Sequence, residues 1–372
     1  MTRTVEIAGA GFAGLSAAAA LAQRGWRVRV HEMAPELRSI GSGIYVFAFA
    51  QEVLRRIEAF DCFSARAFAP TARHIYVDGK LRSTTEPAGQ YRTTTRAALH
   101  HAIHDAAVRA GVEIRTGSRA VGSEEKGVLL LEDGTRLEAD LVIAADGVRS
   151  GISRSLDIPT SRVQHNDGVI RVLLDRSGLR DPKWDAIFDY FDYRGERPLR
   201  VLYSPCGPDR FYFCLMAPAA DRQASSVPVN MELWARRFPD LDSALRRIGD
   251  AGRHDRYTTT TLSQWSRGRV AIVGDAAHAM PSSLGQGAGV SILNAVALAE
   301  AVADAVNLEQ ALGRWEATMR PVVEDWQHRA EDVAMQRSLG AAVVHPGGEL
   351  PGESPEAIPN PGLLGIRSEI SP

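Results

Sequence analysis

The sequence has few cysteines, little net charge and no long apolar run. Its three cysteines, Cys62, Cys206 and Cys214, are an odd number without the spacing of metal ligands, which argues against a disulfide framework and against a zinc site. Lys and Arg number 43 against 45 Asp and Glu, so the formal net charge is −2. Because no overall basic field exists to hold a polyanion, nucleic acid is not an expected partner.

Membrane insertion and secretion are not expected either. The longest apolar stretch, 12–22, contains Gly14 and Ser16 and has about half the length that a bilayer-spanning helix needs. Residues 1–3 alone precede the first expected strand, so we expect no signal peptide. A reducing cytoplasm fits both observations.

Length and composition are those of a globular protein. At 372 residues, 45% of them apolar and 24% charged, the chain is long enough for about two domains with a substantial core. The chain opens with an apolar strand at 4–8, an alanine-rich helix at 12–24 and an alternating strand at 27–31. This order predicts a βαβ unit and hence an α/β fold.

Glycines mark the turn between that first strand and the helix. Gly9 allows a tight turn, Gly11 lets a pyrophosphate approach the backbone, and Gly14 lets the helix pack on the strand. Glu32 ends the next strand, where a carboxylate can accept both hydroxyls of an adenosine ribose. The set predicts a dinucleotide with an unphosphorylated ribose, FAD or NAD; a purely structural turn is the alternative.

A second glycine-rich turn lies near the far end of the chain. Gly274 and Asp275 end an apolar strand, and Gly285, Gly287 and Gly289 open another helix after a proline-containing loop. One phosphate-binding turn would serve NAD, whereas a cofactor with a ribityl chain and an anionic ring needs further contacts. An aspartate can hold ribityl hydroxyls, and a helix N-terminus can stabilise a reduced flavin. The second turn therefore favours FAD.

Between and beyond these turns the pattern predicts strands and helices. A hairpin is expected at 128–137, turning at Asp133 and Gly134. Further strands are expected at 74–77, 112–115, 141–145, 169–174, 187–193, 200–203, 211–216 and 269–273. Helices are expected at 51–60, 96–110, in two pieces near 229–249, at 288–306, and from 308 to about 338 with an interruption at Pro321. The segment from 346 holds six prolines and five glycines and is expected to form an extended arm.

Three motifs in this order resemble those of class A flavoprotein monooxygenases, the para-hydroxybenzoate hydroxylase-like group. They are Gly9 to Gly14 with Glu32, Asp146-Gly147 with Arg149-Ser150, and Gly274-Asp275 with 281–289. The resemblance implies an α/β fold in which a Rossmann-like FAD-binding domain of the GR2 type is interleaved with a smaller sheet-based substrate domain, plus C-terminal helices. We expect the FAD-binding domain to comprise 1–70, 92–160 and 262–338, the substrate domain 71–91 and 161–261, and a Pro/Gly-rich arm 339–372.

The same resemblance implies the cofactor contacts. The first glycine turn would hold the pyrophosphate, Arg38 and Arg96 would reach the ribose, pyrophosphate or ribityl region, and Asp275 would hold the ribityl chain. Asp146 lies in the motif that the family associates with both FAD and NAD(P)H. The full set implied for FAD is Gly9, Gly11, Phe12, Ala13, Gly14, Glu32, Met33, Arg38, Arg96, Val121, Asp146, Gly274, Asp275, Gly285, Gly287, Ala288 and Gly289.

A closer resemblance is to the branch of that family that acts on hydroxylated pyridine carboxylates. It is carried by 36–38, 41–45, 202–206, 215–221 and 225–228, and by Asn294, where many family members have an acid. Matching positions imply a substrate site made of Arg171, Arg200, Tyr212, Tyr45 and Tyr257, with Pro281 beside the flavin. Arg73 stands where that branch has a tyrosine.

The residues themselves leave alternatives open. Arg171 and Arg200 lie in apolar strands, so each needs a carboxylate partner from the protein or from a ligand. The three tyrosines could equally be core or rim aromatics. His100 and His104 are expected on a solvated helix face, and His278 is expected to be structural.

The family resemblance implies a single-component enzyme with tightly bound FAD. NAD(P)H, a transient co-substrate, would reduce the flavin, and dioxygen would form a flavin hydroperoxide that hydroxylates a hydroxylated aromatic or pyridine carboxylate. Ring opening is an optional second step of this implied reaction. The alternatives are oxygenation of a non-aromatic small molecule and a flavin-dependent reductase. A homodimer is compatible with the sequence, and no membrane partner is expected.

Overall fold

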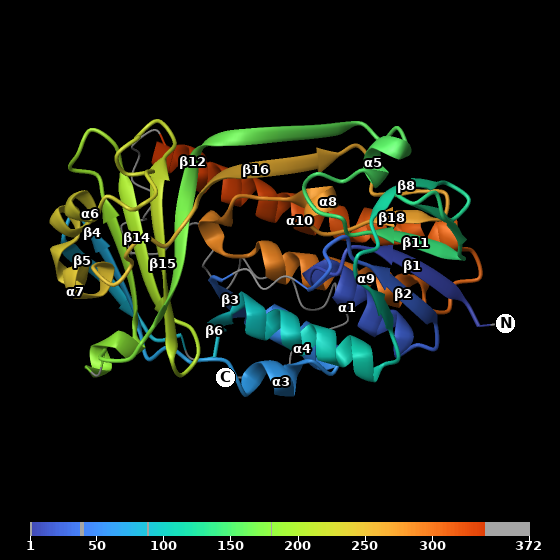
Figure 1. Cartoon of the computed structure of the whole chain (residues 1–372), viewed down its shortest axis with the longest axis horizontal. Helices are drawn as coiled ribbons and strands as arrows, with labels where there is room; N and C mark the ends of the chain where they lie inside the picture. Colours follow the sequence, from blue (N-terminus) through green and yellow to red (C-terminus); the bar gives the residue numbers. More distant parts are fainter. Residues whose placement is uncertain (1, 38–40, 88, 180, 339–372) are drawn as a thin grey trace.

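The computed structural model describes residues 2–37, 41–87, 89–179 and 181–338. Arg38, expected at the cofactor, and the expected arm 339–372 lie outside these residues. Figure 1 shows an elongated molecule with a large sheet at each end and helices packed beside both sheets. Among the described residues no helix is both long enough and apolar enough to cross a membrane.

The first sheet carries the predicted βαβ unit. Its six strands run in the order β17-β18-β11-β1-β2-β7. They are β17 (Ser266–Arg267), β18 (Val270–Ile272), β11 (Leu141–Ala144), β1 (Thr4–Ala8), β2 (Arg27–His31) and β7 (Glu113–Arg115). All neighbours pair in parallel except β17 with β18. Helices α1 (Phe12–Ala22), α4 (Arg96–Arg109) and α9 (Gly287–Val302) pack beside one another and share the core of this sheet. Because β1, β11 and β18 run parallel, their carboxyl ends meet at one edge of the sheet, the usual ligand position in such folds.

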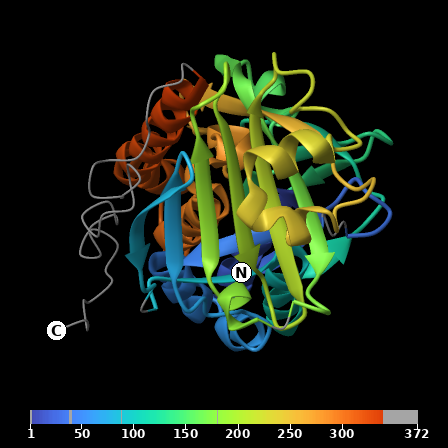
Figure 2. The same cartoon turned by 90° about the vertical axis from the view of Figure 1, so that its left-hand side faces the viewer.

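The second sheet has seven strands in the order β16-β12-β15-β14-β13-β4-β5. They are β16 (His254–Leu262), β12 (Thr160–Asp175), β15 (Arg210–Pro218), β14 (Leu199–Pro205), β13 (Ile187–Asp192), β4 (Arg73–Val77) and β5 (Lys80–Thr85). Helices α6 (Met231–Arg237) and α7 (Asp242–Leu245) cover its outer face, as Figure 2 shows. Trp234 and Leu245 from these helices join Tyr203 and Phe213 of the sheet in one buried cluster.

Two smaller sheets complete the structure. Strands β8 (Ala120–Glu124), β9 (Val128–Leu131) and β10 (Arg136–Glu138) form one, and β3 (Gly43–Phe47) pairs with β6 (Tyr91–Thr95) in the other. The hairpin predicted at Asp133 and Gly134 is confirmed, because β9 and β10 pair across it and Gly134 has φ +87. The remaining helices are α2 (Ala48–Arg56), α3 (Phe60–Ser64), α5 (Ile152–Ser155), α8 (Asp275–His278), α10 (Leu308–Ser338) and the 3₁₀ turns Pro182–Asp185, Pro239–Leu241 and Ser282–Leu284.

Several predicted boundaries were wrong. The helix expected at 51–60 is two helices, α2 and α3, and α9 ends at Val302 rather than at 306. Helix α10 continues through Pro321 instead of breaking there. A proline removes the hydrogen bond to the carbonyl four residues earlier. Here that carbonyl belongs to exposed Ala317, while buried Met319 and Val323 anchor the helix on both sides of the proline.

Candidate functional site

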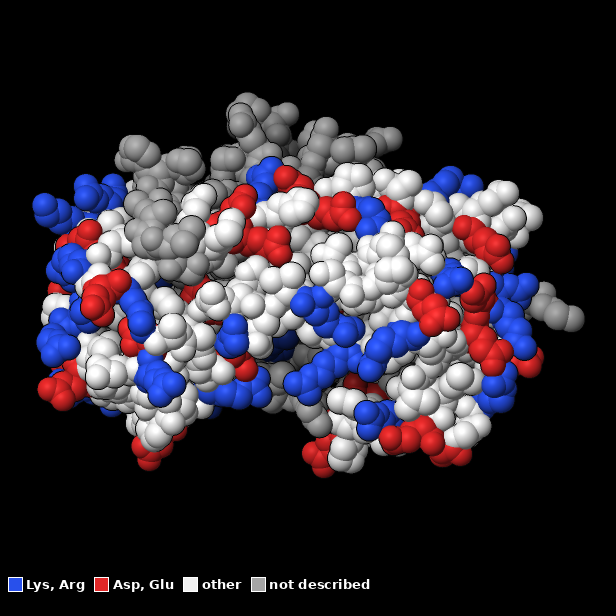
Figure 3. All heavy atoms as spheres, turned by 90° about the horizontal axis from the view of Figure 1, so that it is seen from above, with Lys and Arg blue, Asp and Glu red and all other residues white. Residues whose placement is uncertain are grey.

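A cavity of about 690 Å³ lies between the two large sheets. Its lining comes from the turn after β1, the start of α4, the segment from β18 to α9, and the inner face of the seven-stranded sheet. Figure 3, a view from above, shows a hollow between the two ends of the molecule with arginine and lysine side chains around it. The site expected at the carboxyl ends of the parallel strands and the one expected on the second sheet are therefore parts of one space.

The glycines of the first turn differ in what surrounds them. A Cβ on Gly9, which has φ +100, would lie 2.3 Å from the Ala145 carbonyl oxygen, and one on Gly14 would lie 2.0 Å from the Gly9 carbonyl oxygen. Gly11, by contrast, lines the cavity, and a Cβ added there would have no atom within 4 Å. Gly9 and Gly14 are therefore required for packing, whereas Gly11 leaves open space beside the backbone, as the sequence predicts for a pyrophosphate.

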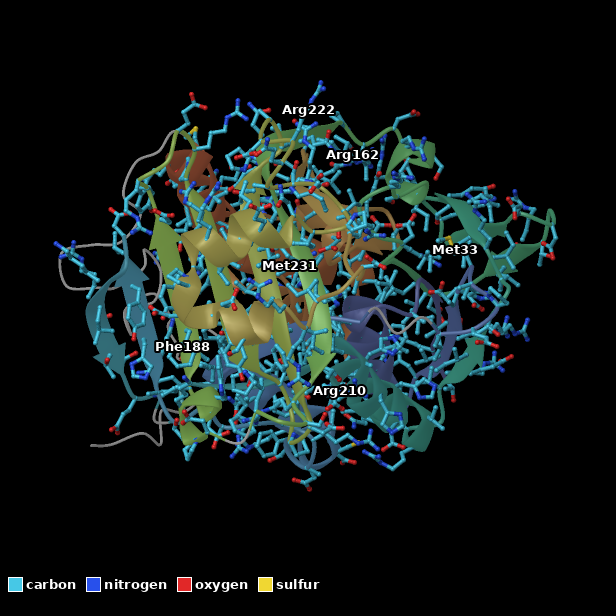
Figure 4. The ribbon with its side chains drawn as sticks, turned by 60° about the vertical axis from the view of Figure 1, so that its left-hand side comes forward. Met33, Arg162, Phe188, Arg210, Arg222 and Met231 are labelled. Atoms are coloured by element: carbon cyan, nitrogen blue, oxygen red, sulfur yellow. The ribbon has the colours of Figure 1, made fainter. Side chains whose placement is uncertain are left out.

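Glu32, which directly follows β2, hydrogen-bonds to the backbone of the same turn. Its two carboxylate oxygens accept hydrogen bonds from the backbone N–H of Ala10 at 3.0 Å and of Ala34 at 2.9 Å. Met33 and Val121 are 57% and 43% exposed. Neither they nor Glu32 are among the described residues that line the cavity. Figure 4 places Met33 at the end of the molecule away from Phe188 of the second sheet. These residues thus form a separate, open edge beside the first turn.

The two glycine turns touch each other. A Cβ on Gly274, which has φ +63, would lie 2.8 Å from the Ala13 Cβ, so only glycine allows this approach without displacement. Asp275 follows at the start of α8, lines the cavity and is accessible within it. Enclosure by protein raises the pKa of Asp275, and the nearby Arg96 guanidinium opposes that rise. Arg96 itself lies over the Phe12 ring at 4.8 Å.

The second turn lines the cavity only in part. Gly285, Gly287 and Ala288 face it, together with Met280. Gly289, expected at the ring edge of the flavin, lies elsewhere: a Cβ there would come within 3.0 Å of the Phe49 ring, so its role is close packing of α9 on α2. Pro281 is buried and is not among the described residues that line the cavity. Among the described residues neither one lines the cavity, and their contacts with the flavin stay predictions.

Arg200 has its carboxylate partner within the protein. Its Nε and Nη2 donate to the two carboxylate oxygens of Asp189 at 2.7 and 2.8 Å, and Nη1 donates to the Ser283 carbonyl at 3.2 Å. Arg73 donates to the same Asp189 at 2.6 Å. Burial acts to raise the pKa of Asp189, but Arg200 and Arg73 outweigh it and hold that pKa below its ordinary value. Asp189 was missed from the sequence, although an acid within the apolar run 187–191 was a signal.

Arg171 is held more loosely than Arg200. Its Nη2 donates to the Ser282 hydroxyl at 2.7 Å, and its Nη1 lies 3.6 Å from an Asp255 carboxylate oxygen. The side chain is 31% exposed and lines the cavity. Arg171 is thus an arginine with donors that a ligand can reach.

Two of the three predicted tyrosines lie together in the cavity. Tyr45 and Tyr212 are 6.3 Å apart between ring centroids, in an edge arrangement. A Cβ on Gly43 would lie 1.8 Å from the Tyr212 ring, so this ring rests directly on the backbone of β3. Burial raises the pKa of both tyrosines well above the ordinary value. Tyr257 is buried in the adjoining cluster with Tyr212 and is not among the described residues that line the cavity, so its role at the substrate stays a prediction.

Three further polar residues, none of them among the described residues that line the cavity, make hydrogen-bond contacts within the protein. Asp146 Oδ2 accepts from the Gly151 backbone at 2.8 Å and so caps α5. His278 is buried, Asn294 lies 2.8 Å from its Nε2, and burial lowers the His278 pKa to about 4, which agrees with a structural, uncharged imidazole. His100 corrects the prediction of a solvated helix face, because its Nε2 lies 2.7 Å from the Ala10 carbonyl oxygen.

Comparison with known proteins places this geometry among flavoproteins. The family profile described as FAD binding domain matches residues 2–330. The 2-heptyl-3-hydroxy-4(1H)-quinolone synthase of Mycobacteroides abscessus is 38% identical over 335 residues, 87% of each chain. The 6-hydroxynicotinate 3-monooxygenase of Pseudomonas fluorescens is 27% identical over 339 residues, 84% of this chain and 86% of the relative. The tetrameric form of 2-methyl-3-hydroxypyridine-5-carboxylic acid oxygenase is 40% identical, with a TM-score of 0.86 over 91% of this chain and 92% of that one.

Proposed function

Because this chain belongs to the FAD-binding family of aromatic monooxygenases, we propose that it uses NAD(P)H and dioxygen to hydroxylate an aromatic or pyridine ring that bears a hydroxyl and a carboxylate. Opening of the hydroxylated ring is a second step within the same proposal. The observation that carries the substrate class is Arg171, whose guanidinium faces the cavity and is only loosely paired with Asp255.

The residues around the cavity fit FAD. The open backbone at Gly11 suits the pyrophosphate, and Asp275, at the other glycine turn, offers a carboxylate to ribityl hydroxyls. The first backbone N–H groups of α9, at Gly287 and Ala288, have no acceptor within the helix, and both residues line the cavity, so these donors would stabilise negative charge on the ring. Bound FAD would supply the electrons that activate dioxygen.

Arg171 would hold the carboxylate of the ring. A guanidinium binds a carboxylate through two parallel N–H donors, which fixes orientation as well as position. Arg200 is engaged on both carboxylate oxygens of Asp189, so its role in the proposal is to shape the wall and to hold the Ser283 backbone. This assigns ligand binding to Arg171 and positioning to Arg200.

Tyr45 and Tyr212 would orient the ring hydroxyl. Because burial raises the pKa of each tyrosine, both phenols are protonated at neutral pH and can donate hydrogen bonds. They would thereby fix which ring carbon faces the flavin, while the aromatic side chains keep water away from the reacting atoms.

A neutral alkylquinolone is the second candidate substrate. Two relatives from Rhodococcus erythropolis, named as a probable and a putative 2-heptyl-3-hydroxy-4(1H)-quinolone synthase, and one from Mycobacteroides abscessus with the name 2-heptyl-3-hydroxy-4(1H)-quinolone synthase are 36%, 39% and 38% identical to this chain. Such a ring carries no carboxylate, so it would form no ion pair with Arg171 and would depend on this residue less than an acidic ring does.

The test measures substrate-stimulated oxygen uptake and product mass with purified holoenzyme. Hydroxypyridine carboxylates, hydroxynicotinates, hydroxybenzoates and 2-heptyl-4(1H)-quinolone are compared with NADH or NADPH as reductant. We expect an acidic ring to stimulate oxygen uptake and to gain one or two oxygen atoms. Stimulation by the quinolone alone would select the second candidate, and anaerobic turnover with an electron acceptor in place of oxygen uptake would select a reductase.

Substitution of Arg171 separates the two substrate classes. Arg171→Met should weaken binding of the acidic ring by about 10- to 100-fold, because a hydrogen bond to a charged group contributes about 1.5–3 kcal/mol. Arg162→Met is the matched control, since Arg162 is an exposed arginine on the same strand, near the upper edge of the molecule in Figure 4. Ligand affinity is measured by the change in the flavin spectrum, and FAD content is checked in each variant. Equal affinity of wild type and Arg171→Met for the acid would remove this residue from the site.

A further inference from the structure

His100 contacts the backbone of the first glycine turn from the side. Helix α4 begins at Arg96, where the Thr95 hydroxyl accepts from the Ala98 N–H at 3.0 Å, and it packs along α1 (Figure 1). About one helical turn after Arg96, the His100 Nε2 lies 2.7 Å from the Ala10 carbonyl oxygen. A carbonyl can only accept, so the imidazole must carry a proton on Nε2 and donate it.

Ala10 is therefore held at both of its polar backbone groups. Its N–H donates to Glu32 Oε2 at 3.0 Å, and its carbonyl accepts from His100. The preceding residue is fixed as well, since the Gly9 N–H donates to the His31 carbonyl at 2.8 Å. The turn reaches the cavity with its peptide planes already set.

The contact with the Ala10 carbonyl determines where the next N–H points. The peptide that joins Ala10 to Gly11 is trans, because Val227-Pro228 is the cis bond among the described residues. In a trans peptide the C=O and the N–H point in opposite directions. When the Ala10 carbonyl turns toward His100, the Gly11 N–H must turn away from it. Gly11 lines the cavity, and a Cβ there would meet nothing within 4 Å, so there is open space beside this peptide.

We propose that His100 is a positioning residue of the FAD site, which orients the Gly11 N–H toward the pyrophosphate by holding the Ala10 carbonyl. A donor fixed before the cofactor arrives needs no reorganisation on binding. Without His100, that carbonyl loses its hydrogen-bond donor, and the direction of the Gly11 N–H in the same peptide is fixed less firmly. The role concerns the cofactor alone, so it holds for either candidate substrate.

The test compares His100→Leu with His100→Gln. Leucine removes the donor and keeps apolar bulk, whereas the glutamine amide restores an N–H at similar reach. His104→Leu is the matched control, because His104 lies four residues further along α4 and is also half-buried. For each apoenzyme, affinities for FAD, ADP and adenosine are measured by titration, the rate of FAD release is measured from the holoenzyme, and the unfolding temperature of the apoenzyme is recorded.

We expect His100→Leu to weaken FAD and ADP by about tenfold, the size of one typical hydrogen bond. Adenosine lacks the pyrophosphate, so its affinity should stay unchanged, and His100→Gln should recover most of the loss. His104→Leu should bind all three ligands as wild type does. Three results would overturn the proposal: wild-type affinity for FAD and ADP in His100→Leu, an equal loss for adenosine, or a glutamine variant as weak as leucine. A lower unfolding temperature with unchanged ADP affinity would likewise leave His100 a purely structural residue.

Discussion

Gly11 and Gly14 stand three residues apart in the same turn, yet a methyl group would have opposite consequences at each. Gly11→Ala meets nothing within 4 Å and should leave the fold intact while its methyl group occupies the space beside the backbone where the pyrophosphate would lie. Gly14→Ala would place its Cβ 2.0 Å from the Gly9 carbonyl oxygen and should destabilise the protein by about 1–3 kcal/mol or more. Urea unfolding and FAD titration of both apoproteins measure the two effects.

The pair is its own control. We expect Gly11→Ala to unfold at the wild-type urea concentration and to retain little FAD, and Gly14→Ala to unfold at a lower concentration. If Gly11→Ala bound FAD as tightly as wild type does, the pyrophosphate would have to lie elsewhere.

At this scale the sequence predicts local constraints better than distant partners. The glycine turn was predictable because its requirements involve neighbours in the chain. The partner of Arg200 was not, because Asp189 lies 11 residues away on another strand and also binds Arg73, 116 residues distant. Likewise, the four-residue spacing of His100 and His104 did not predict the contact of His100 with the Ala10 carbonyl, because the two residues are 90 positions apart in the sequence.

Among the elements, α10 joins the second sheet to the loop that precedes α9. Gln327, only 4% exposed, donates to the Thr260 carbonyl of β16 at 2.8 Å and to the Ala279 carbonyl at 3.0 Å. Gln327→Leu removes both donors in a buried place, which should lower the free energy of unfolding by about 1–3 kcal/mol. Gln310→Leu, an exposed position on the same helix, serves as the control. Equal urea midpoints for the two variants would show that these contacts do not stabilise the structure.

The helices and strands were predicted well where the apolar period was strong. Strands β1 and β2 match their predicted bounds, because a buried parallel strand and an alternating one leave clear patterns. The prediction of 169–174 covered only part of β12, which begins at Thr160. Its first half is exposed and polar, so the pairing with β16, rather than burial, extends the strand. Strands β3 and β6 were missed because they pair with each other across the 43 intervening residues 48–90, and a pairing over that distance leaves no local pattern in the sequence.

For the molecule as a whole, the predicted α/β fold and the family resemblance are confirmed by the 40% identity and TM-score of 0.86 to a pyridine-carboxylate oxygenase. The division into an FAD-binding domain and a substrate domain stays a prediction. The sequence pattern did not predict that both large sheets border one cavity. That arrangement depends on the paired strands β12 and β16, which span the molecule from one sheet to the other (Figure 1).

Because both glycine turns border this cavity, we predict that two segments far apart in the sequence bind opposite ends of the cofactor. Asp275 lies at the second glycine turn. Asp275→Asn keeps an acceptor oxygen but loses the charge that strengthens its hydrogen bond, so it should weaken FAD binding by about tenfold and leave ADP affinity unchanged. Ligand that binds only the folded state raises stability by RT ln(1 + [L]/Kd), about 2.7 kcal/mol at one hundred times Kd. Unfolding temperatures at one fixed ligand concentration should therefore rise less with FAD in Asp275→Asn than in wild type, and equally with ADP. Gly274 packs closely against Ala13, so a change at Asp275 could also act on FAD through the first glycine turn. An equal loss of affinity for ADP would show that Asp275 acts in this indirect way.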